Sequence, residues 1–321
     1  MDRAIKVTVI GAGLMGHGIG QVFAREGHAV VLSDPDAAAL GRALDKMRQN
    51  LVDDGADPER VLCNVSTEVA LAQAVAHADL VIEAVPERLA LKQQLFQDLA
   101  EAAPEHAILA SNTSVIPITD IGAGLSEHPR GRLVGTHWWN PPHLVPLVEV
   151  VRTAHTRMDV FEQMYAWLEA VGKRPVKVHR DVTGFIGNRL QHAMWREAIG
   201  LVEDGVCDAE AIDLVVKNSF GLRGPVLGPM ENADLVGLEL TRDVHRVMFP
   251  ALRTDAEPSP LLDRLIAQGH LGMKAGQGLR SWTAESADQV RLELARHLRR
   301  MTRSEDPCTQ IQATPGKHPT R

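Results

Sequence analysis

A glycine-rich loop near the start of the chain constrains the fold more than any other feature of this sequence. Lys6–Ile10 alternates polar and apolar residues and then turns apolar, as a buried parallel strand does, and GAGLMG follows at 11–16. A stretch with helical spacing and a second apolar run, Ala29–Ser33, come next. A strand, a loop, a helix and a second strand within about 30 residues predict one βαβ unit.

The glycine spacing GxGxxG predicts that this loop binds the pyrophosphate of a dinucleotide. Gly11 permits a tight turn, Gly13 lets the pyrophosphate approach the backbone, and Gly16 lets the helix pack closely on the strand. The N-terminus of the helix supplies free amides and a partial positive charge. Leu14 and Met15 lie in the same loop and are included in the predicted cofactor site.

Asp34 indicates which dinucleotide the loop binds. It ends the second apolar run, 18 positions beyond Gly16. A carboxylate at this place accepts hydrogen bonds from the adenosine ribose hydroxyls, and its charge repels a 2′-phosphate. Pro35 follows it, so no arginine stands beside it. We therefore expect NAD, and not NADP, as the cofactor.

Strands and helices continue to alternate up to about residue 180. Strands are predicted at Leu80–Val85, Ile108–Ser111, Leu133–Thr136, Leu147–Val151 and Val176–His179, and helices at 35–51, Ala90–Ala103 and Asp159–Val171. This alternation is typical of an α/β protein with a doubly wound parallel sheet, so a Rossmann-type domain is predicted over residues 1–181.

The pattern changes after Val182. Helices are predicted at Phe185–Val202, Ala209–Asn218 and Asn232–Phe249. The Gly/Pro-rich segment GLRGPVLGP at 221–229 interrupts them, and no convincing strand follows. An all-helical second domain is therefore expected over 182–301. Residues 302–321 contain almost no apolar side chains and are predicted to form a disordered tail.

Composition and charge exclude several classes of protein. The chain has 321 residues, of which 45% are hydrophobic and 23% charged, and its formal net charge is −7. This balance is typical of a globular chain of two domains, and the negative charge argues against nucleic acid or an anionic membrane as partner. No apolar run approaches the ~20 residues that span a bilayer. The first residues run straight into a strand and leave no room for a signal peptide, so we expect a cytoplasmic protein.

The cysteines give no sign of a disulfide framework or a metal site. Cys63, Cys207 and Cys308 lie far apart, without a CxxC pair and without a nearby cluster of histidines. We expect reduced thiols in a reducing compartment and no bound metal.

Four motifs carry a family resemblance. They are SNTS at 111–114, GTHWWNPPHLVPLVEVV at 135–151, TGFIGNRL at 183–190 and KAGQGLRSW at 274–282. With these motifs in this order, the chain resembles the L-3-hydroxyacyl-CoA dehydrogenase family over nearly its whole length. The resemblance implies a Rossmann domain that binds NAD, a helical domain through which two copies dimerise, and oxidation of a 3-hydroxyl group on a small-molecule substrate.

The resemblance assigns four catalytic positions. His137 occupies the histidine of the family's H-aromatic-aromatic-N-P signature, which implies a general acid/base, and an imidazole suits that task because it titrates near neutral pH. Glu149 matches the glutamate that orients this imidazole. Ser114 and Asn188 match the residues expected to hydrogen-bond the substrate oxygen.

Three further positions match the family's nicotinamide site, whereas four other titratable side chains are interpreted as structural or surface residues. The predicted cofactor residues are Glu87, Lys92 and Asn112. The side chains interpreted as structural or surface residues are Glu83, His143, His192 and His245.

The substrate is the point at which this sequence departs from acyl-CoA relatives. Pro146 stands where those relatives commonly carry a lysine. Asp53, Asp54, Asp57 and Glu59 lie near the expected place of a CoA nucleotide phosphate, which they would repel weakly. The NPP…PLVE pattern resembles the branch that contains lambda-crystallin (L-gulonate 3-dehydrogenase), carnitine dehydrogenase and dehydrogenases of small pyridine carboxylates.

Several interpretations of substrate and activity stay open. The substrate is a 3-hydroxyacyl-CoA of fatty acid metabolism, such as 3-hydroxybutyryl-CoA, or a small free acid such as L-gulonate, L-carnitine or a pyridine carboxylate. Arg223 in GLRGP either clamps such a carboxylate or is an ordinary surface residue. A non-catalytic, crystallin-like NAD-binding protein is disfavoured because all four catalytic positions are present. A 6-phosphogluconate-type dehydrogenase is set aside because Lys217, the only lysine in 182–273, directly precedes Asn218 and lacks the helical spacing.

Overall fold

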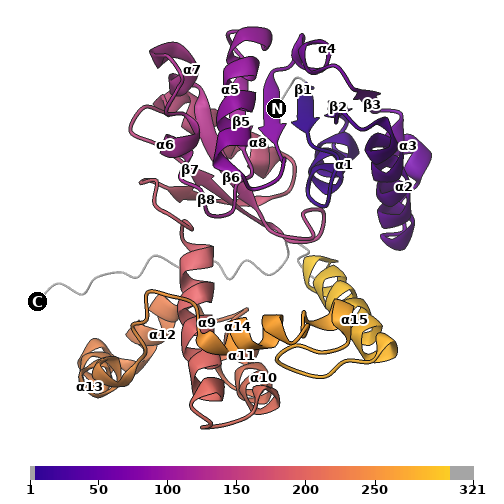
Figure 1. Ribbon diagram of the computed structural model, residues 1–321. Coiled ribbons are helices and arrows are strands. Elements are labelled where there is room, and N and C mark those ends of the chain that lie inside the picture. The colour runs from indigo at the N-terminus through magenta and orange to yellow at the C-terminus, as the bar shows by residue number, and fades with distance from the viewer. Residues whose placement is uncertain (1–3, 304–321) are drawn as a thin grey trace, which may run out of the picture. The chain divides into compact units, whose positions relative to one another are not determined.

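The computed structural model describes residues 4–303, and the chain divides into two compact units (Figure 1). Of the described residues, 4–188 and 294–303 form the first unit, and Arg189–Glu293 forms the second. The predicted boundary after residue 181 stays a prediction. The predicted tail lies outside the described residues from 304 on, whereas residues 302 and 303 belong to the last helix.

An eight-stranded sheet forms the centre of the first unit (Figure 1). Its strands are β1 (Lys6–Ile10), β2 (Ala29–Ser33), β3 (Val65–Glu68), β4 (Leu80–Glu83), β5 (Ile108–Ser111), β6 (Leu133–Trp138), β7 (Leu147–Val151) and β8 (Arg174–Val178). Their order is β3-β2-β1-β4-β5-β6-β7-β8, so the chain moves outward from β1 to β3 and then returns to the other side of β1. Doubly wound sheets bind their ligands at such a reversal, at the carboxyl ends of the strands.

Helices cover both faces of this sheet. They are α1 (Gly16–Arg25), α2 (Ala37–Asp53), α3 (Pro58–Leu62), α4 (Leu71–Val75), α5 (Leu89–Ala102), α6 (Ile118–Ile121), α7 (Glu127–Gly131) and α8 (Met158–Ala170). One face buries Phe23 of α1, Met47 of α2 and Phe161 of α8. The other buries Phe96 of α5 and Ile118 of α6. Because both faces are covered, the central strands consist mainly of apolar residues.

β6 and β7 depart from the parallel sheet that the sequence predicts, because they pair antiparallel. The other neighbouring strands of the sheet pair in parallel. The connection between β6 and β7, residues 139–146, is too short for a parallel crossover, which needs a dozen or more residues. The antiparallel register places His137 directly opposite Glu149.

From residue 187 the regular elements of the described chain are helices, apart from two isolated β-bridges that join Gln277 to Gly272 and to Ser281. Its helices are α9 (Gly187–Glu203), α10 (Ala209–Asn218), α11 (Phe220–Arg223), α12 (Pro229–Val236), α13 (Leu238–Met248), α14 (Pro260–Ala267) and α15 (Ala284–Arg303). The helix predicted at Asn232–Phe249 is in fact two helices, broken at Gly237, whose φ of +94° favours glycine. Of the described helices, none combines the length and the apolar character needed to cross a membrane.

Candidate active site

The glycine loop lies between β1 and α1, and its three glycines have different surroundings. Gly11 has a φ of +97°, and a Cβ there would lie 2.7 Å from the carbonyl oxygen of Ala84. A Cβ at Gly16 would overlap the carbonyl oxygen of Gly11, so only glycine lets α1 begin this close to the strand. A Cβ at Gly13 would meet nothing within 4 Å. Contacts within the protein explain Gly11 and Gly16, whereas Gly13 leaves open space, so the loop fits a bound pyrophosphate.

Asp34 follows β2 and organises the same loop. Its Oδ2 accepts a hydrogen bond from the Ala12 amide at 3.0 Å, and its Oδ1 accepts one from the Asp36 amide at 3.0 Å. The side chain is partly exposed, and an ionised carboxylate has further lone pairs for ribose hydroxyls. Leu14 is 63% exposed on the loop, and Met15 is half-buried.

His137 and Glu149 form a buried hydrogen-bonded pair. Nδ1 of His137 on β6 lies 2.7 Å from Oε2 of Glu149 on β7. The two residues are only 3% and 1% exposed. Among the described residues, none forms a hydrogen bond with Nε2 of His137, so this nitrogen is free to exchange a proton with a ligand.

The second oxygen of Glu149 is held by the segment that leads into α9. Its Oε1 accepts hydrogen bonds from the amides of Ile186 at 2.8 Å and Gly187 at 3.1 Å. Phe185, the preceding residue, has a φ of +50°, which is uncommon for an aromatic residue and turns the chain at this point. Glu149 therefore cannot rotate away from His137 without losing these bonds as well.

The hydrogen bonds to Glu149 also determine its ionisation. Burial by itself raises the pKa of this carboxyl group, but the hydrogen bonds from His137, Gly187 and Ile186 outweigh burial and bring the pKa below its usual value. Glu149 is therefore a carboxylate at neutral pH, and it can stabilise a positively charged imidazole.

Aromatic side chains enclose the imidazole. The ring centroid of Trp139 lies 5.1 Å from that of His137, and the ring centroid of Phe185 lies 5.7 Å from it. A Cβ at Gly187 would overlap the Trp139 indole, so glycine lets α9 begin against this ring. With water excluded by these rings, the attraction between His137 and Glu149 is stronger than it would be at the surface.

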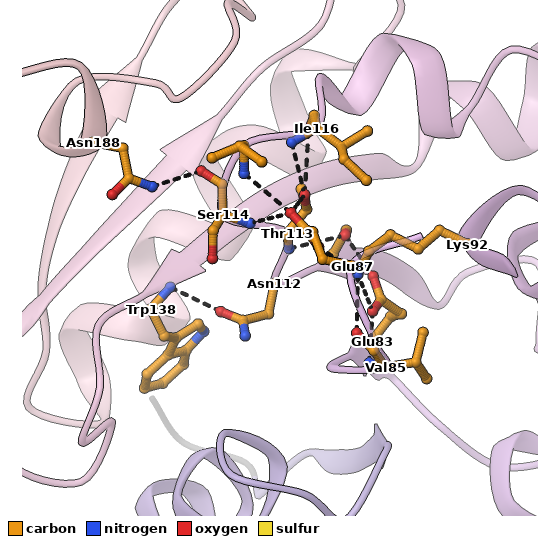
Figure 2. Close-up of polar contacts among 12 residues, drawn as sticks. Glu83, Val85, Glu87, Lys92, Asn112, Thr113, Ser114, Ile116, Trp138 and Asn188 are labelled. Atoms are coloured by element: carbon orange, nitrogen blue, oxygen red, sulfur yellow. Dashed lines mark hydrogen bonds and ion pairs between the residues drawn. The ribbon is translucent and has the colours of Figure 1, made fainter. Parts of the chain in front are cut away.

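Ser114 and Asn188 meet through one hydrogen bond, which Figure 2 shows. Nδ2 of Asn188, in the first turn of α9, donates to the carbonyl oxygen of Ser114 at 2.8 Å. The bond uses only the backbone of Ser114, and its hydroxyl bonds to no other described residue. Nearby, Oδ1 of Asn112 accepts a hydrogen bond from the Trp138 amide at 3.0 Å, which ties the end of β5 to β6.

Lys92, predicted to line the cofactor site, forms ion pairs with two glutamates of the protein (Figure 2). Its Nζ lies 2.6 Å from Oε1 of Glu83 and 3.2 Å from Oε2 of Glu87, and the side chain is 1% exposed. Glu83, whose burial the sequence did not reveal, is fully buried. Burial raises the pKa of Glu87, but the Thr113 hydrogen bond and the Lys92 charge outweigh it, so the pKa lies below its usual value. The position of Glu83 at the carboxyl end of a central strand was the sequence signal for a role near the site.

The acidic end of α2 is not the unpaired negative patch that the sequence suggests. Arg299, in the C-terminal part of α15, lies 3.2 Å from Asp53 and 3.0 Å from Asp54. Arg48 forms an ion pair with Glu59. These arginines offset the negative charge, so the repulsion expected for a CoA phosphate is weaker than the sequence predicts.

Arg223 and the described cysteines lie apart from the His137–Glu149 pair in the sequence, and neither forms a metal site with other described residues. Arg223 ends α11 in the second unit and is exposed, and its role as a carboxylate clamp stays a prediction. The described residues include no cluster of three or more His, Cys, Asp or Glu side chains that could hold a metal ion. Cys63 and Cys207 are free thiols.

The fold and the site define the class of protein. A dinucleotide-binding loop, an acidic residue at the end of β2 and a His–Glu pair on neighbouring strands are the features of an NAD-binding dehydrogenase. The model of the 3-hydroxyacyl-CoA dehydrogenase NAD-binding domain matches residues 6–182, and that of the C-terminal domain matches residues 184–282. The chain belongs to the 3-hydroxyacyl-CoA dehydrogenase family, and it is an NAD-dependent oxidoreductase that acts on CH–OH donors.

Relatives from both substrate classes are similar to this chain. The 5-formyl-3-hydroxy-2-methylpyridine 4-carboxylate 5-dehydrogenase of Mesorhizobium japonicum is 34% identical over 91% of this chain and 95% of its own length. The human mitochondrial hydroxyacyl-coenzyme A dehydrogenase is 38% identical over 85% of this chain and 89% of its own length. A crystal structure of an FHMPC 5-dehydrogenase, described as an NAD+ dependent dismutase, has a TM-score of 0.86 and 34% identity, covering 95% of this chain and 100% of that one.

Proposed function

We propose that the protein moves a hydride between a 3-hydroxyl carbon and NAD, with His137 as the general acid/base and Glu149 as the residue that orients it. The observation that supports this most is the fixed pair. Glu149 accepts from Nδ1 with one oxygen and from two backbone amides with the other, so the imidazole presents Nε2. A base held in one tautomer and one orientation is what proton transfer from an alcohol needs.

In the oxidation direction, Nε2 of His137 takes the proton of the substrate hydroxyl as the carbon–hydrogen bond breaks. Bound NAD+ supplies the acceptor for the hydride. The Glu149 carboxylate stabilises the positive charge that the imidazole gains. We assign to Ser114 and Asn188 the hydrogen bonds to the substrate oxygen, and their contact with each other supports this assignment.

The catalytic assignment is tested by His137→Ala. Loss of a general base lowers kcat by about 10²–10⁴-fold. The dissociation constant for NAD, measured by fluorescence titration, stays within about threefold, because the glycine loop is untouched. A variant that retains most of its turnover would refute the assignment.

We propose a small free carboxylic acid as the substrate class. The support is the similarity, over nearly the full length of both chains, to a relative named for a pyridine carboxylate. Pro146, where acyl-CoA relatives commonly carry lysine, agrees with this choice.

A 3-hydroxyacyl-CoA thioester is the second candidate, and one structural observation favours it. Arg299 pairs with Asp53 and Asp54, so this end of α2 opposes a nucleotide phosphate less than the sequence alone predicts. A screen of NADH production decides between the two classes. It compares L-3-hydroxybutyryl-CoA with free 3-hydroxy acids, including L-gulonate and L-carnitine, and the class with the higher kcat/KM is the substrate class.

Arg223 provides a second test of the free acid. If its guanidinium clamps the substrate carboxylate, Arg223→Lys already raises KM, because a point charge does not reproduce the planar two-donor fork. Arg223→Ala raises KM further, by about 1.5–3 kcal/mol of binding. Unchanged KM values in both variants, together with good activity on a CoA thioester, would return the protein to the acyl-CoA class.

We also propose a homodimer formed through the second unit. Gly200 and Ala287 are the only buried residues of Arg189–Glu293, all of which the structure describes. Large apolar side chains on its helices are exposed instead, and Val226 reaches 88% and Val247 73%. A unit of this size without a core needs a partner to bury its apolar surface, and a second copy of the chain offers the same surface.

Light scattering coupled to size-exclusion chromatography tests the dimer. We expect twice the mass of one chain for the wild type and the mass of one chain for Val247→Glu, because a charge at an exposed position is harmful only when a partner covers it. Lys46→Glu, on α2 of the first unit, serves as the control. A monomeric wild type would refute the proposal.

The cytoplasmic location stays a prediction from the sequence.

A further inference from the structure

Glu83 and Lys92 form a fully buried ion pair whose two partners lie on different elements. Glu83 ends β4 and is 0% exposed, and Lys92 lies on α5 and is 1% exposed. Nζ of Lys92 lies 2.6 Å from Oε1 of Glu83. Burying two charges is costly, and replacing a buried ion pair by apolar residues of similar volume is often neutral or stabilising. Its presence therefore calls for a role other than stability.

The pair is joined to the last residue of β5 and to the segment that follows β4. Oε2 of Glu83 accepts a hydrogen bond from Oγ of Ser111 at 2.6 Å. Oε1 of Glu83 also accepts from the Val85 amide at 2.7 Å, while Nζ of Lys92 donates to the carbonyl oxygen of Val85 at 3.3 Å. Oε2 of Glu87 completes the surroundings of the lysine at 3.2 Å. The three donors of the Lys92 ammonium thus have acceptors on Glu83, Val85 and Glu87.

Glu87 connects the Glu83–Lys92 ion pair to Ser114 (Figure 2), because it contacts both Lys92 and the Ser114 amide. Its Oε2 is held by Lys92, and its Oε1 accepts from the Thr113 hydroxyl at 2.5 Å, the Ser114 amide at 2.9 Å and the Val115 amide at 3.1 Å. Three successive residues of this turn are therefore arranged around a single carboxylate oxygen. The carbonyl oxygen of Ser114 is at the same time fixed by Asn188.

We infer that Glu83 is a positioning residue for the reaction, which acts by holding Lys92, and through it Glu87, so that the turn at 113–115 presents Ser114 to the substrate. This inference rests on the proposed role of Ser114. Glu83 itself touches neither substrate nor cofactor in this scheme, since it is fully buried. The network fixes the backbone of the serine from one side, and Asn188 fixes it from the other.

The double variant Glu83→Gln/Lys92→Met tests the inference, because it removes both charges and leaves no unpaired buried ion. We expect it to fold, with a melting temperature closer to that of the wild type than that of Lys92→Met alone, which leaves Glu83 without its cation. Its kcat falls on the order of 10²-fold, the effect of a misplaced catalytic group. Arg132→Met is the matched control. Arg132 is 1% exposed, and among the described residues it donates only to the backbone carbonyls of Pro104, Ala107 and Ala100. Its loss therefore lowers the melting temperature and leaves kcat within about threefold.

The double variant combined with Ser114→Ala separates positioning from a merely structural role. If Glu83 acts through Ser114, the double variant lowers kcat by less than about threefold in the Ser114→Ala background, because residues that act as a unit are not additive. Two results would overturn the inference while the role of Ser114 stands. One is a double variant that lowers kcat as much in the Ser114→Ala background as in the wild type, and the other is a double variant with wild-type kcat. Wild-type kcat in Ser114→Ala would overturn the proposed role of Ser114 and this inference with it.

Discussion

Glu149 faces His137 across the antiparallel strands β7 and β6, and its two carboxylate oxygens have separate partners. Oε2 takes the imidazole, whereas Oε1 takes the amides of Ile186 and Gly187 at the start of α9. The pair therefore joins the two strands of the sheet to the chain that leads into the helical unit. A change at Glu149 is expected to alter the imidazole and the entry to α9 together.

Glu149→Gln is expected to lower kcat by about 10²–10⁴-fold. An amide has a single oxygen, so it cannot accept from Nδ1–H and from the two backbone amides at once, and the imidazole loses its orientation or its tautomer. Because the pKa of Glu149 lies below its usual value, the carboxylate is ionised throughout the neutral range. The kcat values of wild type and variant at neutral pH, where the carboxylate is ionised, measure this loss, and a variant that retains most of the wild-type kcat would contradict this account.

Gly13→Ala and Gly16→Ala are expected to separate cofactor binding from folding. A Cβ at Gly13 meets nothing within 4 Å, so this variant keeps the melting temperature of the wild type and loses NAD affinity, because the methyl group occupies the approach of the pyrophosphate. A Cβ at Gly16 overlaps the carbonyl oxygen of Gly11, so this variant is destabilised by about 1–3 kcal/mol as well. Calorimetry and NAD titration measure the two effects. Tight NAD binding by Gly13→Ala would show that the pyrophosphate lies elsewhere.

Replacing Asp34 by a neutral residue, as in Asp34→Ser, is expected to weaken NAD binding by about 1–3 kcal/mol. The carboxylate that accepts from the amides of Ala12 and Asp36 is also the predicted acceptor for the ribose hydroxyls. Without its charge the site opposes a 2′-phosphate less, so the ratio of kcat/KM for NADP to that for NAD should rise. Equal efficiency of the wild type with the two cofactors would refute the role of Asp34.

His143 is expected to make the fold sensitive to acid. It lies in the connection between β6 and β7, and its buried Nδ1 has no hydrogen-bond partner among the described residues. Burial lowers the pKa of His143 from 6.5 to about 4, although the charge of Asp54 opposes this. Between these two values the folded protein binds fewer protons than the unfolded chain, so stability falls as the pH decreases through that window.

Urea unfolding at pH 7 and pH 5 measures this effect. His143 accounts for about 2 kcal/mol of the stability lost between these pH values, and His143→Gln should lose that much less. His128→Gln, at an exposed histidine, is the matched control. The same pH dependence in His143→Gln and in the wild type would contradict the prediction.

Local patterns in the sequence were sufficient for the nucleotide-binding half of the protein. β1, β2, β5 and β7 have the bounds that their apolar runs predict, and the spacing of Gly11, Gly13 and Gly16 indicates the loop. These features depend on neighbours in the chain, because a buried strand and a tight turn each require particular residue types at fixed offsets. β3 escaped prediction because VSTE lies at the edge of the sheet, partly exposed, and has no continuous apolar run.

The sequence by itself determined the glycine loop and the apolar strands on either side of it, while the tertiary structure decided which side chains meet. Strand periodicity reports burial and not the partner strand, so only the fold shows that β6 and β7 run antiparallel and that Glu149 faces His137. The place of Glu83 at the end of an apolar strand indicates a role near the site, but only the fold shows that Glu83 is buried and paired with Lys92. From the sequence alone Asp53 is predicted to be an unpaired charge, and only the fold shows that Arg299, distant in the sequence, forms an ion pair with it. The energy of a charge or a polar group depends on what surrounds it in space, and packing brings together residues that the chain keeps far apart.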